Sequence, residues 1–157
     1  MSIKFVVATE SDAEVIARFV IKLTEEIFLK TNANFFSINL EETVERCREL
    51  IRDKNYGAII GYMAGQPIAM STFTESYALY AGGKIGIIPE FYVEPAHRSS
   101  GAGTKLISAV KDYGRDHGWS CIELCTPPLP EFERTLAFYE CNGLIPVGGR
   151  KMRQHIF

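Results

Sequence analysis

Apolar side chains recur along this chain with two different spacings, and each spacing predicts a different element. Residues 3–7 are apolar except for Lys4, which predicts a first strand. Between Val15 and Leu29 apolar side chains return every three or four residues, which predicts a helix. Ser11 and Glu14 have the spacing of a capping box, so this helix should begin beside them.

A second helix and a hairpin are predicted next. Residues 39–55 place apolar side chains at helical spacing among many charged ones, which predicts a strongly charged helix. Residues 58–63 and 67–73 favour strands, and Gly65 between them suits the positive φ of a hairpin turn. Residues 77–83 are expected to form a loop.

The next stretch predicts a strand, a helix and a further strand. Residues 84–93 are apolar and β-rich, but Pro89 cannot donate a hydrogen bond to a neighbouring strand, so we expect a bulge or an edge there. Residues 104–117 have helical periodicity, and Gly118 is a natural stop for the helix. Residues 119–125 read as the following strand.

The last part of the chain predicts one helix and two short strands. Three prolines within residues 126–130 exclude a helix and predict a rigid turn. Residues 131–141 then favour a helix, and residues 144–147 and 150–156 are expected to pair as terminal strands. Strands and helices therefore alternate around a central sheet, and we expect a single mixed α/β domain over residues 1–157.

Composition and charge narrow the class of protein. A chain of 157 residues that is 46% hydrophobic can bury a substantial core. A formal net charge of -2 argues against a global basic surface, so no nucleic-acid partner is expected. The apolar start is too short for a secretory signal, and no stretch reaches the length that spans a bilayer. We therefore expect a soluble, cytoplasmic protein.

The cysteines do not predict a metal centre. Cys47, Cys121, Cys125 and Cys141 form no CxxC pair, and no histidines flank them at metal-site spacing. Cys121 and Cys125 lie on one face of a predicted strand, where small buried thiols are the simpler interpretation.

The segment Arg98-Ser99-Ser100-Gly101-Ala102-Gly103 has the composition of a phosphate-binding loop. It follows a predicted strand and leads directly into a predicted helix. Small residues let backbone N–H groups converge on a phosphate, and a helix N-terminus adds unpaired donors and the positive end of its dipole. Gly101 and Gly103 are expected to give the backbone room, and Arg98 to add a charge-assisted hydrogen bond.

Two nucleotide-binding patterns are excluded, and another family's pattern matches. The residue three beyond Gly103 is Leu106, so GxGxxG is not met, and the Walker sequence is absent. The arrangement Val93-x-Pro95-x-x-Arg98-x-x-Gly101-x-Gly103 resembles motif A of the GNAT family of acyl-CoA-dependent N-acetyltransferases. Residues 137–144, a helix with Tyr139 followed by a glycine–aliphatic step, resemble motif B of that family. The order of elements resembles the family's over nearly the whole chain.

The resemblance implies both a fold and a donor. It implies a GNAT fold: a central mixed, largely antiparallel sheet of six to seven strands, splayed at the cofactor-binding strand and flanked by about four helices. It implies acetyl-CoA as cofactor, with pantetheine meeting the backbone of Phe91, Tyr92 and Val93. The residues that it implies for the pyrophosphate are Arg98, Ser99, Ser100, Gly101, Ala102, Gly103 and Thr104.

The same resemblance suggests catalytic residues. Amine acetylation needs a neutral nucleophile, a polarised carbonyl and a proton for the departing thiolate. Tyr139 occupies the motif B position whose phenol lies near the cofactor sulfur in similar enzymes; alternatively it packs the helix onto the sheet together with Phe138. Glu90 lies where similar proteins place an acid against the amine, directly or through water; alternatively it is a solvated residue or part of a structural ion pair.

Other candidate bases have weaker support. Glu123 lies on the strand before motif B, where some relatives use a glutamate, but a structural role is favoured. His97 has a suitable pKa range, but its place in the loop favours a rim position. Many relatives carry an asparagine seven residues before the motif B tyrosine, and here Phe132 stands at that spacing, so that contact is not expected.

The acceptor side is described only by a set of aromatic residues and one acid. In the family the first two helices, their link and nearby loops form this side. An aromatic pocket with an acid would suit a cationic amine, although such aromatics also belong in cores. The candidates are Phe28, Phe35, Phe36, Tyr77, Tyr80 and Glu75.

The hypothesis that follows is an N-acetyltransferase that transfers acetyl directly to a primary amine of a small molecule or peptide, with a homodimer as one possible assembly. An acyl-CoA-binding sensor without turnover is the alternative from another class. A toxin that acetylates aminoacyl-tRNA is a third hypothesis, and the net charge of -2 disfavours it.

Overall fold

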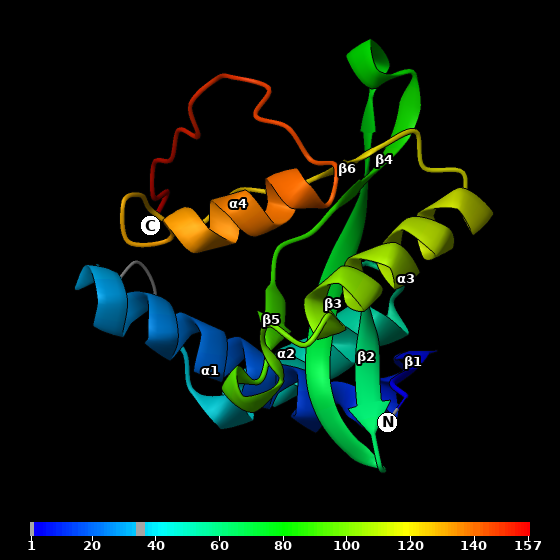
Figure 1. Ribbon diagram of the computed structural model, residues 1–157. Coiled ribbons are helices and arrows are strands. Elements are labelled where there is room, and N and C mark those ends of the chain that lie inside the picture. The colour runs from blue at the N-terminus through cyan, green and yellow to red at the C-terminus, as the bar shows by residue number, and fades with distance from the viewer. Residues whose placement is uncertain (1, 34–36) are drawn as a thin grey trace.

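Six strands and four α-helices make up the computed structural model, which describes residues 2–33 and 37–157 (Figure 1). The helices are α1 (Ala13–Thr31), α2 (Leu40–Arg52), α3 (Ala102–Asp116) and α4 (Glu133–Cys141). The strands are β1 (Lys4–Val7), β2 (Gly57–Met63), β3 (Gln66–Ala78), β4 (Gly83–Ile87), β5 (Phe91–Val93) and β6 (Ile122–Glu123). The expected mixed, largely antiparallel sheet is confirmed.

The sheet follows the order β1-β2-β3-β4-β6, and β5 continues along the same long strand β3 that pairs with β4. All these pairs are antiparallel except β4 with β6, which run parallel. The two-residue turn Ala64–Gly65, with φ of 50° and 77°, joins β2 to β3 as predicted. The hairpin of β3 and β4 projects beyond the helices (Figure 1).

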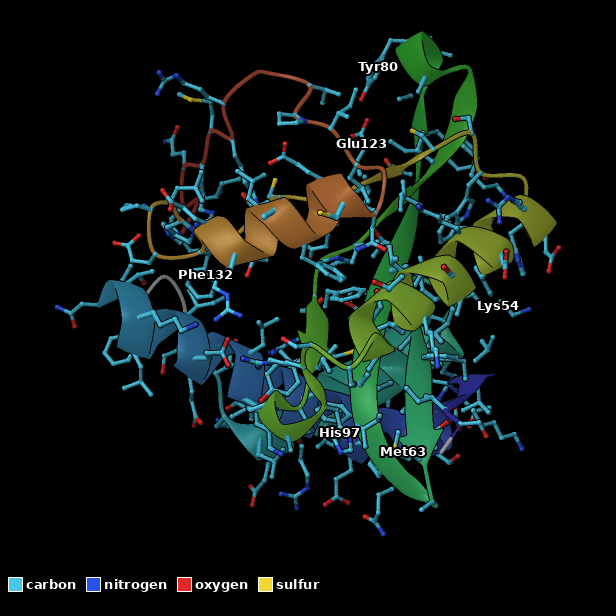
Figure 2. The ribbon with its side chains drawn as sticks, viewed as in Figure 1. Lys54, Met63, Tyr80, His97, Glu123 and Phe132 are labelled. Carbon is cyan, nitrogen blue, oxygen red and sulfur yellow. The ribbon has the colours of Figure 1, made fainter. Side chains whose placement is uncertain are left out.

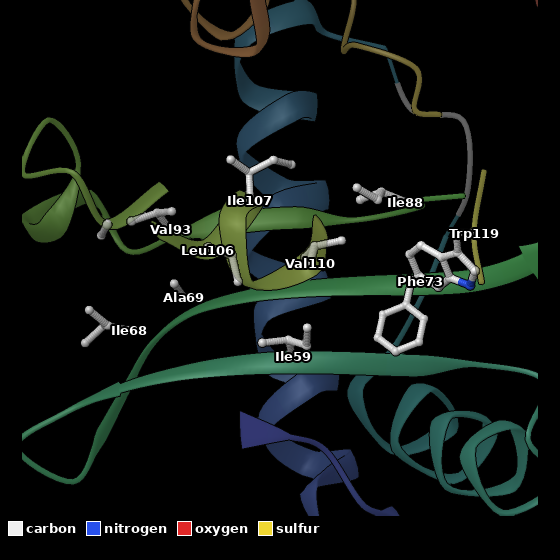
Figure 3. Packing of buried hydrophobic residues seen from close by; sticks show 11 residues of the cluster. Ile59, Ile68, Ala69, Phe73, Ile88, Val93, Leu106, Ile107, Val110 and Trp119 are labelled. Atoms are coloured by element: carbon white, nitrogen blue, oxygen red, sulfur yellow. The ribbon is translucent and has the colours of Figure 1, made fainter. Parts of the chain in front are cut away.

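Helices cover both faces of this sheet because its inner strands are apolar on both sides. Ile59 faces the cluster formed with α3, which includes Leu106 and Val110 (Figure 3). Its neighbour Ile60 faces the opposite cluster, formed with α1 and α2. Successive side chains of a strand point to opposite faces, so one strand serves both cores.

Trp119 fixes the end of α3 against β4 through two glycines. A Cβ at Gly86 would lie 2.2 Å from the indole, and one at Gly114 would lie 2.6 Å from it. The indole Nε1 donates a hydrogen bond to Glu75 Oε2 at 2.7 Å. The glycines therefore provide the space that the ring occupies between strand and helix.

Three local predictions are wrong. At the start of α1 the cap uses Thr9 and Asp12 rather than Ser11 and Glu14: the Thr9 N–H donates to Asp12 Oδ2 at 2.8 Å, and a 3-10 turn leads into the helix. β3 extends to Ala78, so Tyr77 lies in a strand and not in a loop. β6 spans two residues of the seven expected.

The predicted terminal strands at residues 144–147 and 150–156 are also wrong, because the described chain has no strand after β6. Val147 is 81% exposed and Ile145 is 75% exposed. Alternating apolar residues form a strand only where a neighbouring edge and an apolar surface accept them. The short β6 offers very little edge for such pairing.

Candidate active site

The sheet splits at Pro89, and the backbone hydrogen bonds locate the split. The N–H of Gly86 donates to Cys121 O, just before β6, at 3.0 Å. The N–H of Ile88 donates to Glu123 O in β6 at 2.9 Å. The next group in this series, the N–H of Glu90, turns to the opposite side and donates to Thr72 Oγ1 at 3.0 Å. One extra residue is inserted there, as in a β-bulge, so the expected bulge is confirmed.

Beyond the split, one edge of β5 has backbone groups that do not hydrogen-bond to β3. Glu90 O accepts from Thr72 N at 2.9 Å and Glu94 N donates to Ile68 O at 2.8 Å, so alternate residues of this strand bond to β3. In an antiparallel pair the intervening residues point their N–H and C=O groups the other way. The backbone groups of Phe91 and Val93 therefore face the open side of the split.

A helix N-terminus lies just beyond this edge. The chain leaves β5 through the 3-10 turn Pro95–His97 and enters α3, for which Gly101 is the N-cap with φ of 88° and no side-chain cap. The first helical bond runs from Lys105 N to Gly101 O at 3.0 Å. The N–H groups of Ala102, Gly103 and Thr104 thus have no partner within the helix, an arrangement that suits a phosphate.

The two glycines of this loop have different roles. Gly101 has no neighbour within 4 Å of a built Cβ, so its positive φ is what favours glycine there. A Cβ at Gly103 would lie 2.9 Å from Phe138 Cε1 of α4. The absence of a side chain at Gly103 therefore lets α3 and α4 approach closely, which the loop hypothesis did not foresee.

Arg98 joins the loop to α1. Its Nη2 donates to Glu26 Oε1 at 2.7 Å, and its Nε donates to Val93 O at 2.8 Å. The guanidinium also lies 5.3 Å from the centre of the Tyr92 ring. In this structure the side chain thus holds the loop in place.

Glu90 is held by two hydroxyl groups. Tyr56 OH donates to its carboxylate, at 2.7 Å to Oε1, and Thr72 Oγ1 donates to Oε2. Burial raises the pKa of Glu90, whereas these two hydrogen bonds lower it. Burial and the nearby Glu90 charge raise the pKa of Cys47 on α2 to about 11. Glu90 is therefore paired, as a carboxylate among apolar neighbours must be.

Tyr139 lies on the other face of β5. It is 7% exposed, and its ring centre is 5.8 Å from that of Phe91 in an edge-to-face arrangement. Tyr92, the next residue of β5, instead contacts Phe19 of α1 at 5.6 Å. Burial raises the pKa of Tyr139, so its phenol stays protonated at neutral pH. Glu90 and Tyr139 thus approach the split from opposite faces of the sheet.

The structure does not bring the described acceptor aromatics Phe28, Tyr77 and Tyr80 together. Tyr77 and Tyr80 are 77% and 83% exposed on the projecting hairpin, and Tyr80 OH lies 3.5 Å from Glu123 Oε2 (Figure 2). Tyr77 is five residues along β3 from Thr72, or roughly 16 Å at about 3.3 Å per residue. Phe28 lies on the last turns of α1, half-exposed.

Phe35 and Phe36 lie outside the described residues, and Glu75 is bound to the indole of Trp119. Phe132 stands where many relatives carry an asparagine that contacts the cofactor. Its side chain is buried, and Lys30 Nζ of α1 lies 4.9 Å from its ring centre. His97 lies on the 3-10 turn before the loop (Figure 2).

Sequence reasoning missed Tyr56 and Thr72. Thr72 lies within β3 and Tyr56 lies just before β2, neither with a motif around it, and only the pairing of β2 and β3 with the strand of Glu90 brings them together. Among the described residues, no helix is long and apolar enough to cross a membrane. The same residues contain no group of three or more His, Cys, Asp or Glu side chains placed to hold a metal ion.

Known proteins match this chain in sequence and in fold. The model of the Acetyltransferase (GNAT) family matches residues 21–143. The uncharacterized N-acetyltransferase YhfO of Bacillus subtilis (strain 168) is 36% identical over 74 residues, which are 45% of this chain and 48% of that protein. The chain thus spans about half the length of that curated relative.

Two solved structures illustrate the likeness in fold. A possible acetyltransferase from Clostridium difficile 630 superposes with a TM-score of 0.81 at 16% identity, covering 100% of this chain and 99% of the other. The ribosomal-protein-alanine N-acetyltransferase from Brucella melitensis biovar Abortus 2308 gives 0.74 at 18% identity, covering 98% and 100%.

Proposed function

The chain belongs to the Acetyltransferase (GNAT) family, and from this premise we propose that it transfers an acetyl group from acetyl-CoA directly to a primary amine of a small molecule or peptide. One observation carries the proposal: the backbone edge of β5 that β3 leaves unpaired leads straight to the uncapped N-terminus of α3. Together they provide amide-binding groups followed by a phosphate-binding site, in the order that pantetheine and a pyrophosphate require.

The donor site is assigned from these backbone groups. Acetyl-CoA supplies an acyl group that is already activated as a thioester. The backbone of β5 (Phe91, Tyr92 and Val93) holds the pantetheine arm, with Phe91 and Val93 pointing their N–H groups toward it. The pyrophosphate is held by the loop and the first turn of α3, namely Arg98, Ser99, Ser100, Gly101, Ala102, Gly103 and Thr104.

Glu90 acts as the base and Tyr139 as the acid. Glu90 removes a proton from the attacking amine, directly or through an ordered water. Its burial raises its pKa, which strengthens it as a base, while its two hydroxyl partners lower the pKa and so favour the ionised form. Tyr139 holds its proton at neutral pH and delivers it to the departing thiolate.

The two roles are separated by the sheet. Glu90 lies on the α1–α2 side with Tyr92, and Tyr139 contacts Phe91 on the α4 side. An amine that arrives from the α1–α2 side therefore meets the base before it meets the acyl group. Phe28 belongs to α1, so it is the described aromatic candidate on that side of the sheet. The exposed Tyr77 and Tyr80 are better placed to contact a large acceptor than a small one.

The test is a thiol-release assay with purified protein, acetyl-CoA and a panel of polyamines, aminoglycosides, amino acids and peptide N-termini. At least one amine should release free thiol. Glu90→Gln and Tyr139→Phe should each lower kcat by about 10²-fold or more, the usual contribution of a general base or acid. Glu123→Gln is the matched control and should keep the wild-type rate, since within the described residues Glu123 bonds to an exposed tyrosine and through its backbone.

The opposite outcomes are also clear. Protein that binds acetyl-CoA but releases no thiol with any amine of the panel contradicts the enzyme proposal and favours the sensor. An unchanged rate in Tyr139→Phe removes only the acid assignment.

A further inference from the structure

Two hydroxyl groups from different strands converge on the carboxylate of Glu90. We propose that Tyr56 and Thr72 are positioning residues, which orient this carboxylate toward the split and keep it ionised for proton removal. The inference rests on the function proposed above, because it assigns partners to the proposed base. Neither residue touches the reacting atoms, so neither is a catalytic residue.

The geometry carries the inference. Tyr56 precedes β2, Thr72 lies in the middle of β3, and Glu90 lies at the split, so three separate segments meet at one carboxylate. Thr72 Oγ1 donates to Glu90 Oε2 and accepts from the Glu90 N–H at 3.0 Å. One hydroxyl therefore fixes both the backbone and the side chain of the same residue.

The hydrogen-bonding capacity of the carboxylate leaves room for a substrate. A carboxylate has about four lone-pair sites on its two oxygens. A phenol has one proton, so Tyr56 donates to one oxygen at a time, at 2.5 Å to Oε2 or 2.7 Å to Oε1, and Thr72 donates to Oε2. At least one site on Oε1 remains for an amine or a water. The hydroxyls therefore hold Glu90 without saturating it.

In the described part of the chain, the groups that contact the Glu90 carboxylate are hydroxyls, so hydrogen bonds rather than a cation stabilise its charge. The titratable groups that face it are the Tyr56 phenol beside β2 and the Cys47 thiol on α2, and burial raises the pKa of both. Both are therefore neutral near pH 7. The charges on neighbouring elements act elsewhere: Arg48 on Cys47, and Lys22, Glu26, Glu94 and Arg98 on Tyr92.

The first measurement is the pH dependence of kcat/KM for thiol release in wild type, Tyr56→Phe, Thr72→Val and Thr72→Ser. Loss of a donor to the carboxylate should move the acid limb of the profile upward by about one pH unit in Tyr56→Phe and Thr72→Val. Below both midpoints this lowers kcat/KM about tenfold, and activity recovers at higher pH. Thr72→Ser retains the hydroxyl and should match the wild type.

A merely structural role predicts a different pattern. It would lower kcat/KM by the same factor at every pH, in step with a lower melting temperature, and leave the acid limb in place. That result, or a Tyr56→Phe profile that superposes on the wild type, overturns the inference.

The second measurement does not depend on activity. Protein labelled with 13C at glutamate side chains is titrated by NMR, and the Glu90 signal is identified by its loss in Glu90→Gln. Its midpoint should rise by about one unit in Tyr56→Phe, and an unchanged midpoint refutes the inference even if the wild type is active. The wild type could instead release no thiol with any amine while the midpoint shifts as expected. That result would contradict the proposed function and leave only the ionisation of Glu90 explained.

Discussion

Gly103 gives the sharpest test of how the loop works, because sequence and structure assign it different roles. The sequence hypothesis makes it a point where backbone approaches phosphate, whereas the structure packs Phe138 of α4 against it. In Gly103→Ala the new Cβ would lie 2.9 Å from Phe138 Cε1 and 3.0 Å from Cζ. Carbon atoms are most stable about 3.5 Å apart or more, so the ring must move by roughly 0.6 Å.

The ring is not free to move that far without loss. Its centre lies 5.8 Å from the Phe91 ring and 5.2 Å from the Tyr139 ring. Overpacking of this kind costs about 1–3 kcal/mol. At about 3 °C per kcal/mol for a chain of this size, Gly103→Ala should melt roughly 3–9 °C below the wild type. Ser108→Ala, at an exposed position of the same helix, is the matched control and should show no loss.

A double-mutant cycle with Phe138→Leu separates the two roles. If packing is the constraint, the shorter side chain relieves the clash, and Gly103→Ala costs less in the Phe138→Leu background than in the wild type. Affinity for coenzyme A, measured by calorimetry, should recover in the same background. Stability effects that add within about 0.5 kcal/mol, together with an equal loss of coenzyme A affinity in both backgrounds, would refute the packing argument and restore the phosphate argument.

Three further changes have expected outcomes. Gly86→Ala should lower the free energy of unfolding by about 3 kcal/mol or more in denaturant titrations, because its Cβ would lie 2.2 Å from the buried Trp119 ring; a loss below about 1 kcal/mol would contradict this. Burial raises the folded-state pKa of Glu90, so ionisation costs stability as pH rises from the usual glutamate range through that raised value. Melting curves should therefore show Glu90→Gln equal to the wild type at low pH and more stable at pH 8, and a less stable variant there would refute the sign. Glu26→Gln breaks a half-exposed ion pair with Arg98 and should change the free energy of unfolding by at most about 1 kcal/mol, as checked by the same titrations.

The helices and the loop could be predicted because their signals are local. Helical periodicity identified α1, α2 and α3, and the proline turn before α4 helped to identify that helix. A run of small residues after a strand identified the start of α3 to within two residues. Capping depends on local geometry that several polar residues can supply. Thr9 and Asp12 cap the 3-10 turn that leads into α1, although Ser11 and Glu14 fit the same rule.

Positions that depend on distant partners could not be predicted. Tyr56 and Thr72 lie 34 and 18 residues from Glu90, and only the register of three strands brings them together. The aromatics Tyr77 and Tyr80 looked suitable for a pocket, but the length of β3 carries them to an exposed hairpin. Composition gives residue types for a site; the register decides which of them meet.

Pro89 connects the fold to the proposed chemistry. Gly86 and Ile88 donate their N–H groups toward β6, so the N–H that Pro89 lacks falls on the β3 side, and the inserted residue then reverses which edge of the strand each backbone group faces. That reversal frees Phe91 and Val93 on the open side and turns the Glu90 N–H toward Thr72. Since the same Thr72 hydroxyl also holds the Glu90 carboxylate, a single irregularity both opens the edge for the donor and fixes the base beside it.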